Sequence, residues 1–123
     1  MTVPVLWHIE VSHYNEKARW ALELKRVSHR RRAPLPGFVH PWVALAKTGR
    51  PTFPILEIDG RAVRDSTAII AELERRAPDP PLYPADPSER RRALELEEWF
   101  DEEVGPHPRR LAFYEISQDR ELA

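Results

Sequence analysis

The stretch RPTFPILEIDGRAVRDSTAII, residues 50–70, decides the fold. It is strongly apolar over 53–58, and the Asp-Gly pair that follows is typical of a two-residue hairpin turn leading into a second strand over 61–64. Pro54 is unusual at the head of a buried strand, because its ring removes a donor from the hydrogen-bond ladder. We expect Pro54 to begin the strand after a cis bond, which would turn the backbone of Phe53 outward, free to pair with an extended ligand.

Hydrophobic patterning extends this hairpin into an α/β domain. On its N-terminal side the pattern predicts a strand over 4–10, a helix over 12–26, a half-exposed strand over 27–35 and a short helix over 40–47. On its C-terminal side, residues 65–77 read as a helix that stops at Pro78. The predicted order is β-α-β-α-β-β-α, within a domain of residues 1–77.

The rest of the chain has a different character. Residues 78–87 contain five prolines and predict a stiff, extended linker. Apolar residues spaced by three or four then predict a long amphipathic helix over 88–104, which Gly105 and the prolines after it should break or kink. The tail 111–122 could resume as helix, although its apolar face needs partners. We therefore expect an incomplete all-α domain over 88–123.

Composition excludes several functional classes. The chain has 123 residues and no cysteine, so disulfides, thiolate metal sites and dithiol redox chemistry are ruled out. The net charge is −1, with both signs spread along the chain, which argues against nucleic-acid binding. No stretch resembles a signal peptide or a membrane span, so we expect a cytoplasmic protein without membrane contact. No histidine pair has metal-ligand spacing with a supporting carboxylate, and we predict no metal.

Candidate site residues lie where predicted strands hand over to helices, the usual place for ligands in open α/β sheets. Ser12 opens the first helix, so its hydroxyl could bind an anion or stabilise a ligand thiolate. It could equally be an N-cap, which is worth about 1 kcal/mol. Asp65 and Ser66 open the third helix, and neither is followed by Glu or Gln three residues later, so no reciprocal capping box explains them.

At these residues the sequence resembles the N-terminal, thioredoxin-like domain of the glutathione S-transferase superfamily, from about Val3 to Ala77. SHYNEKAR resembles the segment in which a catalytic Ser or Cys opens the family's first helix. TFPIL resembles its cis-proline strand, and DSTAII its acid-serine pair. LYPADPSERRRALELEEWF resembles the family's linker and the start of its all-helical second domain.

The resemblance implies how a thiol would be activated. Ser12 lies at the catalytic position, where a hydroxyl donates a hydrogen bond to the glutathione sulfur and stabilises the thiolate. Tyr14 is a rival donor or a wall of the ligand pocket. Two positions depart from the family pattern. His13 stands where redox-like classes usually carry proline, and Asn15 stands where they carry a second small or thiol residue.

The resemblance also implies how glutathione would be held. The backbone of Phe53, before the cis bond to Pro54, would pair with the cysteinyl unit. Asp65 and Ser66 would hold the γ-glutamyl amine and carboxylate, and His40 would meet the glycyl carboxylate.

Three functions follow, in this order of preference. The first is a glutathione transferase, with glutathione as co-substrate, a small electrophile as second substrate, and a homodimer as the expected assembly. The second is a non-catalytic binding or dimerisation module that uses the exposed apolar face of the long helix. The third is a nucleic-acid contact through Arg30–Arg32 and Arg90–Arg92, which are more simply explained as solvated surfaces. We interpret His8, in the first strand, as a core histidine.

Overall fold

The structure is a computed structural model that describes residues 2–34 and 39–119 and divides into two compact units, Met1–Leu82 and Tyr83–Ala123. Three parts of the predicted elements lie outside the described residues. They are residue 1 of the first domain, residue 35 of the second strand and residues 120–122 of the tail.

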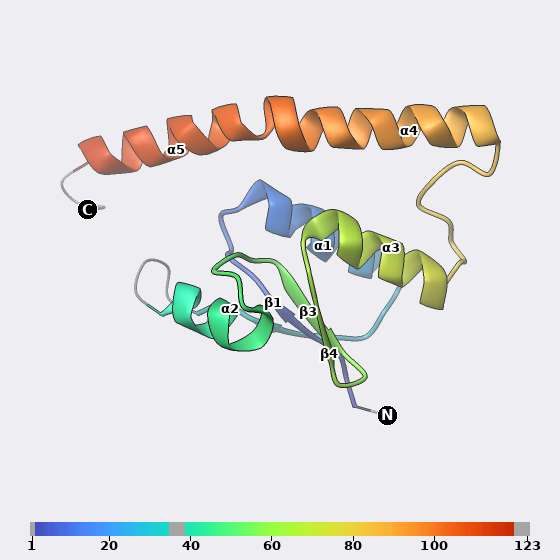
Figure 1. The fold of residues 1–123 in the computed structure, drawn as a ribbon, viewed down its shortest axis with the longest axis horizontal. Helices are drawn as coiled ribbons and strands as arrows, with labels where there is room; N and C mark the ends of the chain where they lie inside the picture. The colour runs from blue at the N-terminus through green and yellow to red at the C-terminus, as the bar shows by residue number, and fades with distance from the viewer. Residues whose placement is uncertain (1, 35–38, 120–123) are drawn as a thin grey trace. The chain divides into compact units, whose positions relative to one another are not determined.

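A mixed sheet forms the centre of the first unit (Figure 1). The strand order is β2-β1-β3-β4, and β1 is parallel to β2 but antiparallel to β3, which pairs antiparallel with β4. The strands are β1 (Val5–Trp7), β2 (Arg30–Arg32), β3 (Ile55–Ile58) and β4 (Arg61–Arg64). With the three helices between and after them, the predicted βαβαββα order of a thioredoxin-like α/β domain is confirmed.

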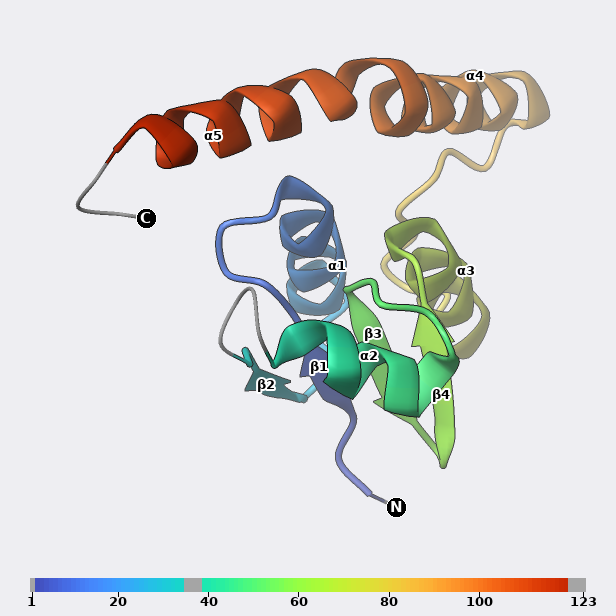
Figure 2. The same ribbon diagram turned by 60° about the vertical axis from the view of Figure 1, so that its left-hand side comes forward.

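Helices cover both faces of this sheet (Figure 2). Helices α1 (His13–Leu24) and α3 (Ser66–Arg76) pack side by side on one face, and α2 (His40–Thr48) lies on the other. Leu6 and Leu56, paired across β1 and β3, are fully buried, and Ile55 and Ile58 of β3 are buried as well. The helices add Ala18, Leu22, Ile69 and Leu73, each at most 1% exposed. Burying each large aliphatic side chain contributes about 1.5–3 kcal/mol.

A polar cluster holds α2 against its face of the sheet. The Trp7 indole N–H donates to the Glu57 carboxylate at 2.6 Å, and Lys47 from α2 forms an ion pair with that carboxylate while lying 4.4 Å from the Trp7 ring centroid. The hydrogen bond from Lys47 is the main reason that the pKa of Glu57 is lowered. Helix α2 ends at Gly49, whose φ of 75° is a left-handed conformation that glycine adopts readily.

The strands are shorter than the sequence pattern predicted. The first expected strand, 4–10, forms ladder pairs over Val5–Trp7, because the backbone beyond Trp7 turns into a loop that bonds to α1 instead. The second, 27–35, forms them over Arg30–Arg32, and all three arginines are exposed, as expected of a solvated edge. An edge strand of this kind remains solvated, and its charges discourage pairing with another chain.

The second unit is one long run of helix. Helix α4 (Pro87–Trp99) begins at Asp86, whose carboxylate accepts from the backbone N–H groups of Ser88 at 3.0 Å and Glu89 at 3.1 Å. A π-helical turn (Phe100–Val104) then leads into α5 (Pro106–Gln118). Where a break or kink was predicted, the helix passes through a wide turn, in which the Gly105 N–H donates to the Phe100 carbonyl at 2.7 Å. No helix in the described part of the chain is long and apolar enough to cross a membrane.

Lys25, which follows α1, anchors the segment that leaves the first unit. Its side chain is fully buried, and its Nζ donates to the carbonyls of Ala77 at 2.5 Å and Pro80 at 2.9 Å. The same ammonium pairs with the Glu74 carboxylate at 2.5 Å, and Glu74 also accepts the Leu82 N–H at 2.9 Å. These bonds fix the path of residues 77–82 along the first unit.

We predict that Lys25→Met lowers the free energy of unfolding by about 3–5 kcal/mol, because it leaves the largely buried Glu74 charge and two carbonyls without their cation. Urea unfolding followed by circular dichroism measures the change. The matched control is Arg75→Met, which removes a cation that is 62% exposed from an ion pair with Glu72. A Lys25→Met loss no larger than that of the control would contradict the anchoring role.

Candidate functional site

The register of the sheet brings the predicted site residues to one end of it. Trp7 pairs with Ile55, and Ile55 pairs with Arg64, so the end of β1, the start of β3 and the end of β4 lie side by side. Segments that follow β1, precede β3 and follow β4 therefore all emerge at that end. They carry Ser12, Phe53, Pro54, Asp65 and Ser66.

Ser12 lies immediately before α1 with extended backbone angles, φ −88° and ψ 127°. Its carbonyl accepts the first helical hydrogen bond, from the Glu16 N–H at 3.0 Å, but its side chain makes no capping bond. Within the part of the chain that the structure describes, the Ser12 hydroxyl has no hydrogen-bond partner at all. The sequence allowed the Ser12 hydroxyl to be an N-cap or a donor to a ligand, and the structure shows no side-chain cap. The hydroxyl sits at the positive end of the helix dipole.

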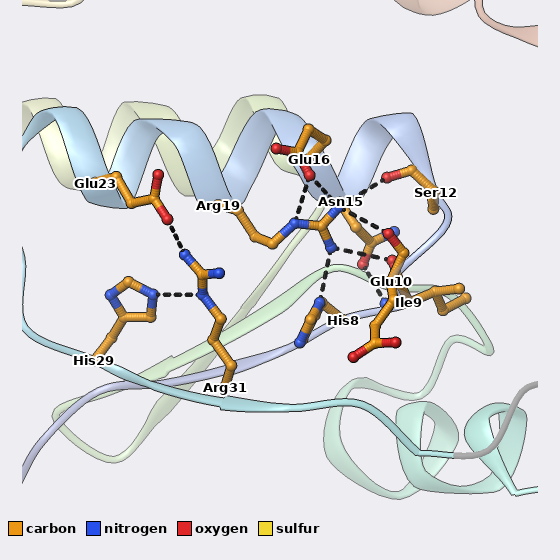
Figure 3. Close-up of polar contacts among 10 residues, drawn as sticks. All are labelled: His8, Ile9, Glu10, Ser12, Asn15, Glu16, Arg19, Glu23, His29 and Arg31. Carbon is orange, nitrogen blue, oxygen red and sulfur yellow. Dashed lines mark hydrogen bonds and ion pairs between the residues drawn. The ribbon is translucent and has the colours of Figure 1, made fainter.

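Asn15 and Arg19, on the buried side of α1, hold the loop that leads to Ser12 (Figure 3). The Asn15 side-chain oxygen accepts the Ile9 N–H at 3.0 Å, and Arg19 donates to the backbone carbonyls of Ile9 and Glu10, both at 3.1 Å. Asn15 is 1% exposed and Arg19 6%. Sequence reasoning missed both roles. The available signal was their spacing, since they share one helical face with the buried Ala18 and Leu22.

His8 is a buried, hydrogen-bonded core histidine, as the sequence analysis expected. Arg19 Nη1 lies 2.7 Å from its Nδ1, and a guanidinium only donates, so this nitrogen accepts and the ring is neutral. The pKa of His8 is lowered from 6.5, first by burial and then by the charges of Arg19 and Arg31, which outweigh the opposing effects of Glu10 and Glu16.

Asp65 adopts an uncommon backbone conformation at the start of α3, with φ 75° and ψ 132°. A residue with a side chain is held in such a region at a cost of about 1–3 kcal/mol. Its carboxylate accepts the Ala68 N–H at 3.3 Å, and its side chain remains exposed. Ser66 is 2% exposed, and its hydroxyl has no hydrogen-bond partner among the described residues.

Phe53 and Pro54 lie just outside the ladder, because β3 begins at Ile55. The Phe53–Pro54 peptide bond is cis, and Pro54 is buried. In the described part of the chain, the backbone N–H and carbonyl of Phe53 have no hydrogen-bond partner. His40, the first residue of α2, places its ring centroid 5.9 Å from that of Phe53. The structure thus brings the predicted His40 next to Phe53.

Tyr14 lies in the first turn of α1, two positions after Ser12. Its ring is tilted against that of His13, with centroids 4.1 Å apart.

This end of the sheet has the chemistry of an anion and peptide site. The N-termini of α1 and α3 both open there, and helix N-termini favour negatively charged groups. An unpaired backbone N–H and carbonyl at Phe53 can pair with an extended chain. Within residues 2–34 and 39–119, no group of three or more acidic or histidine side chains could hold a metal ion.

The sequence matches one protein family. The model described as glutathione S-transferase, N-terminal domain, matches residues 6–81, which is more than half of the chain. No curated protein sequence matches the chain significantly.

Solved structures show the same similarity. A glutathione S-transferase from Methylobacterium radiotolerans, in complex with glutathione sulfonate, is 28% identical with a TM-score of 0.71, over 81% of this chain and 47% of its own. One from Rhodospirillum rubrum is 29% identical with a TM-score of 0.73, over 81% and 46%. A Tau class enzyme from mango, Mangifera indica, shares the fold at 22% identity with a TM-score of 0.78, over 85% and 48%. The chain spans about half the length of these proteins.

We predict that the stability of the protein depends on pH through His8. Because the pKa of His8 is lower in the folded state than its ordinary 6.5, the unfolded chain takes up the proton more readily. Stability is therefore complete above 6.5 and is lost as the pH falls from there toward the lowered value. Urea unfolding of the wild type and His8→Gln, at about pH 7.5 and about pH 5, measures the difference in slope.

The expected result is a smaller loss on acidification in His8→Gln than in the wild type. His13→Gln is the matched control, because it removes an exposed histidine from the same region, and it should leave the wild-type slope unchanged. Equal pH slopes for wild type and His8→Gln would show that the neutral ring is not linked to folding.

Proposed function

The chain belongs to the glutathione S-transferase superfamily, and on that premise we propose that it binds glutathione at the sheet end described above and activates its thiol. The observation that carries the proposal is the Ser12 hydroxyl, which lies at the N-terminus of α1 without a hydrogen-bond partner in the described part of the chain. Such a hydroxyl can donate to the glutathione sulfur, and the helix dipole adds to the stabilisation of the thiolate.

The proposed ligand contacts follow the same end of the sheet. The backbone N–H and carbonyl of Phe53, held before the cis bond to Pro54, pair with the cysteinyl unit as an added strand would. Asp65 and Ser66 bind the γ-glutamyl amine and carboxylate at the start of α3. His40, whose ring adjoins Phe53, meets the glycyl carboxylate. The glutathione sulfonate complex of the similar Methylobacterium protein supports this assignment of the ligand.

The reaction we propose is attack of the thiolate on a small electrophile, with glutathione as co-substrate and no metal. Tyr14 is the rival thiol activator. Its contact with His13 and its place inside the first turn favour a position in the wall of the site. We also propose a homodimer in the cytoplasm, the compartment in which glutathione is abundant, and a chain that has no disulfide fits that reducing compartment.

A second candidate is a binding or dimerisation module without turnover. The observation that favours it is the apolar surface of α5, where Leu111, Phe113 and Tyr114 are each at least 60% exposed. Exposed apolar surface of this kind is typical of an interface with another chain. The first candidate needs bound glutathione and a reaction that Ser12 supports, whereas the second needs pairing with another chain and no turnover.

We predict that about 5 mM glutathione raises the melting temperature, because a ligand that binds the folded state stabilises it by mass action. Ser12→Ala should keep this shift, while the rate with 1-chloro-2,4-dinitrobenzene falls by roughly tenfold or more. Ser28→Ala is the matched control, because it removes an exposed serine hydroxyl outside the site.

The outcomes separate the candidates. No shift in melting temperature would reject glutathione binding. A shift with turnover equal in wild type and Ser12→Ala would reject thiol activation by Ser12, and a shift with no turnover would leave the non-catalytic module.

We predict that Asp65→Gly separates binding from stability. Glycine adopts a positive φ without penalty and is tolerated as an N-cap, so the unfolding free energy should stay the same or rise by about 1 kcal/mol. Loss of the carboxylate should weaken glutathione binding by roughly tenfold. Calorimetric titration measures the affinity and urea unfolding the stability. Unchanged affinity in a stable variant would remove Asp65 from the ligand clamp.

A further inference from the structure

We propose that Arg19 is a positioning residue: it holds the loop of residues 8–12 and thereby sets where the Ser12 hydroxyl lies at the end of the sheet. The hold on the loop is a property of the free protein. Its effect on the thiol rests on the proposed function.

The guanidinium of Arg19 uses all of its N–H groups (Figure 3). Nη1 donates to His8 Nδ1 at 2.7 Å and to the Ile9 carbonyl at 3.1 Å. Nη2 donates to the Glu10 carbonyl at 3.1 Å and lies 3.5 Å from the Ser12 carbonyl. Nε donates to the Glu16 carboxylate at 2.7 Å, and Nη2 also pairs with this carboxylate.

These bonds reach both ends of the short turn that precedes α1. The Ser12 N–H donates to the Ile9 carbonyl at 3.2 Å, and that same carbonyl accepts from Arg19. The Ser12 carbonyl accepts the Glu16 N–H at 3.0 Å and faces Arg19 as well. The backbone of Ser12 is thus fixed on either side of its Cα. Since the hydroxyl is one rotatable bond from that backbone, fixing the turn fixes where the oxygen can lie.

No other side chain can replace the hydrogen bonds of the buried Arg19. An arginine presents five donors in a planar fork, whereas a lysine has three on a single atom and cannot reach the same acceptors together. Glu16, whose side chain is 62% exposed, balances the charge and orients the fork from its outer side. Asn15 accepts the Ile9 N–H from the same helix, but among the described residues its side chain makes no hydrogen bond to Glu10 or Ser12.

The hold is tested in the unliganded, full chain by amide hydrogen exchange. Arg19→Lys keeps the charge and should speed exchange of the Ser12 amide roughly tenfold, because its acceptor, the Ile9 carbonyl, is released. Amides of β3 should not change. Arg75→Lys, an exposed arginine also paired with a carboxylate three residues before it, is the matched control and should change neither. Unchanged Ser12 exchange in Arg19→Lys would overturn the proposal.

If Arg19→Lys does not fold, Glu16→Gln provides the test instead. It replaces an exposed carboxylate by an amide of the same shape, so it weakens the pairing that orients the Arg19 guanidinium and leaves Arg19 in place. It should speed Ser12 exchange by roughly two- to fivefold. Exchange at the wild-type rate would count against the proposal.

The effect on the thiol is tested by a double-mutant cycle. Arg19→Lys should lower kcat roughly tenfold with 1-chloro-2,4-dinitrobenzene, while glutathione affinity stays within roughly threefold of the wild type. Because Arg19 acts through Ser12, the Arg19→Lys/Ser12→Ala double variant should be no slower than Ser12→Ala alone. A further drop equal to that of Arg19→Lys alone would overturn a positioning role, since it would show that the two residues act independently.

The two proposals fail in different ways. If the wild type does not bind glutathione, or if Ser12→Ala keeps full turnover, the proposed function is wrong, and the exchange measurements still decide whether Arg19 holds the loop. If Ser12→Ala is slow but Arg19→Lys is as fast as the wild type, thiol activation stands and the positioning role of Arg19 is wrong.

Discussion

The antiparallel pairing of β3 with β1 is the constraint on which the rest of the structure depends. It sets Ile55 beside Trp7 and, through the hairpin, Arg64 beside Ile55. Because the chain leaves β1 and β4 at the end where it enters β3, three segments distant in sequence meet there. A change of register by one residue would exchange the two faces of β3 and turn the charged Glu57 toward α1 and α3 in place of Leu56, so the packing that stabilises the sheet also fixes which residues meet at this end.

Two different kinds of interaction hold this end of the sheet. The segment around Phe53 and the start of α3 are held by the strand pairing of the neighbouring β3 and β4, and by the apolar core in which Ile55 and Ile69 are fully buried. In the described part of the chain, the loop between β1 and α1 has one ladder-type bond to another strand, from the His8 N–H to the Arg32 carbonyl at 2.9 Å. It depends on side chains from α1 instead. A buried polar network loses stability when one of its groups is left without a hydrogen-bond partner, so the contributions of Asn15 and Arg19 to holding the loop are expected to depend on one another.

The elements of the fold that the sequence predicted correctly are determined by residues close together in the chain. The hairpin follows from Asp59-Gly60, and the helices follow from apolar periodicity, which each segment carries within itself. Helical spacing places Asn15 and Arg19 on the buried face of α1, but the loop whose backbone they bind folds back onto α1 over a distance that no local pattern records. The helix expected to break or kink at Gly105 passes through a π-helical turn. The Gly105 N–H bonds there to the Phe100 carbonyl, and Pro106, which has no N–H to donate, begins α5 directly after it.

The same distinction explains which site residues the sequence could reveal. Pro54 stands out in the sequence because proline is unusual at the head of a strand, and Asp65 because it opens the third helix without a capping box. The positive φ of Asp65 is seen only in the structure. Ser12 was ambiguous, since a serine before a helix serves as a cap or as a donor, and the absence of a capping bond is a property of the folded loop. In the site that we propose, affinity and reactivity therefore rest on separable physical elements. The proposed ligand clamp belongs to the sheet and its core, whereas the position of the Ser12 hydroxyl belongs to a loop held by side-chain hydrogen bonds. On this proposal, substitutions in the loop change the rate of the thiol reaction and leave ligand binding at the end of the sheet intact.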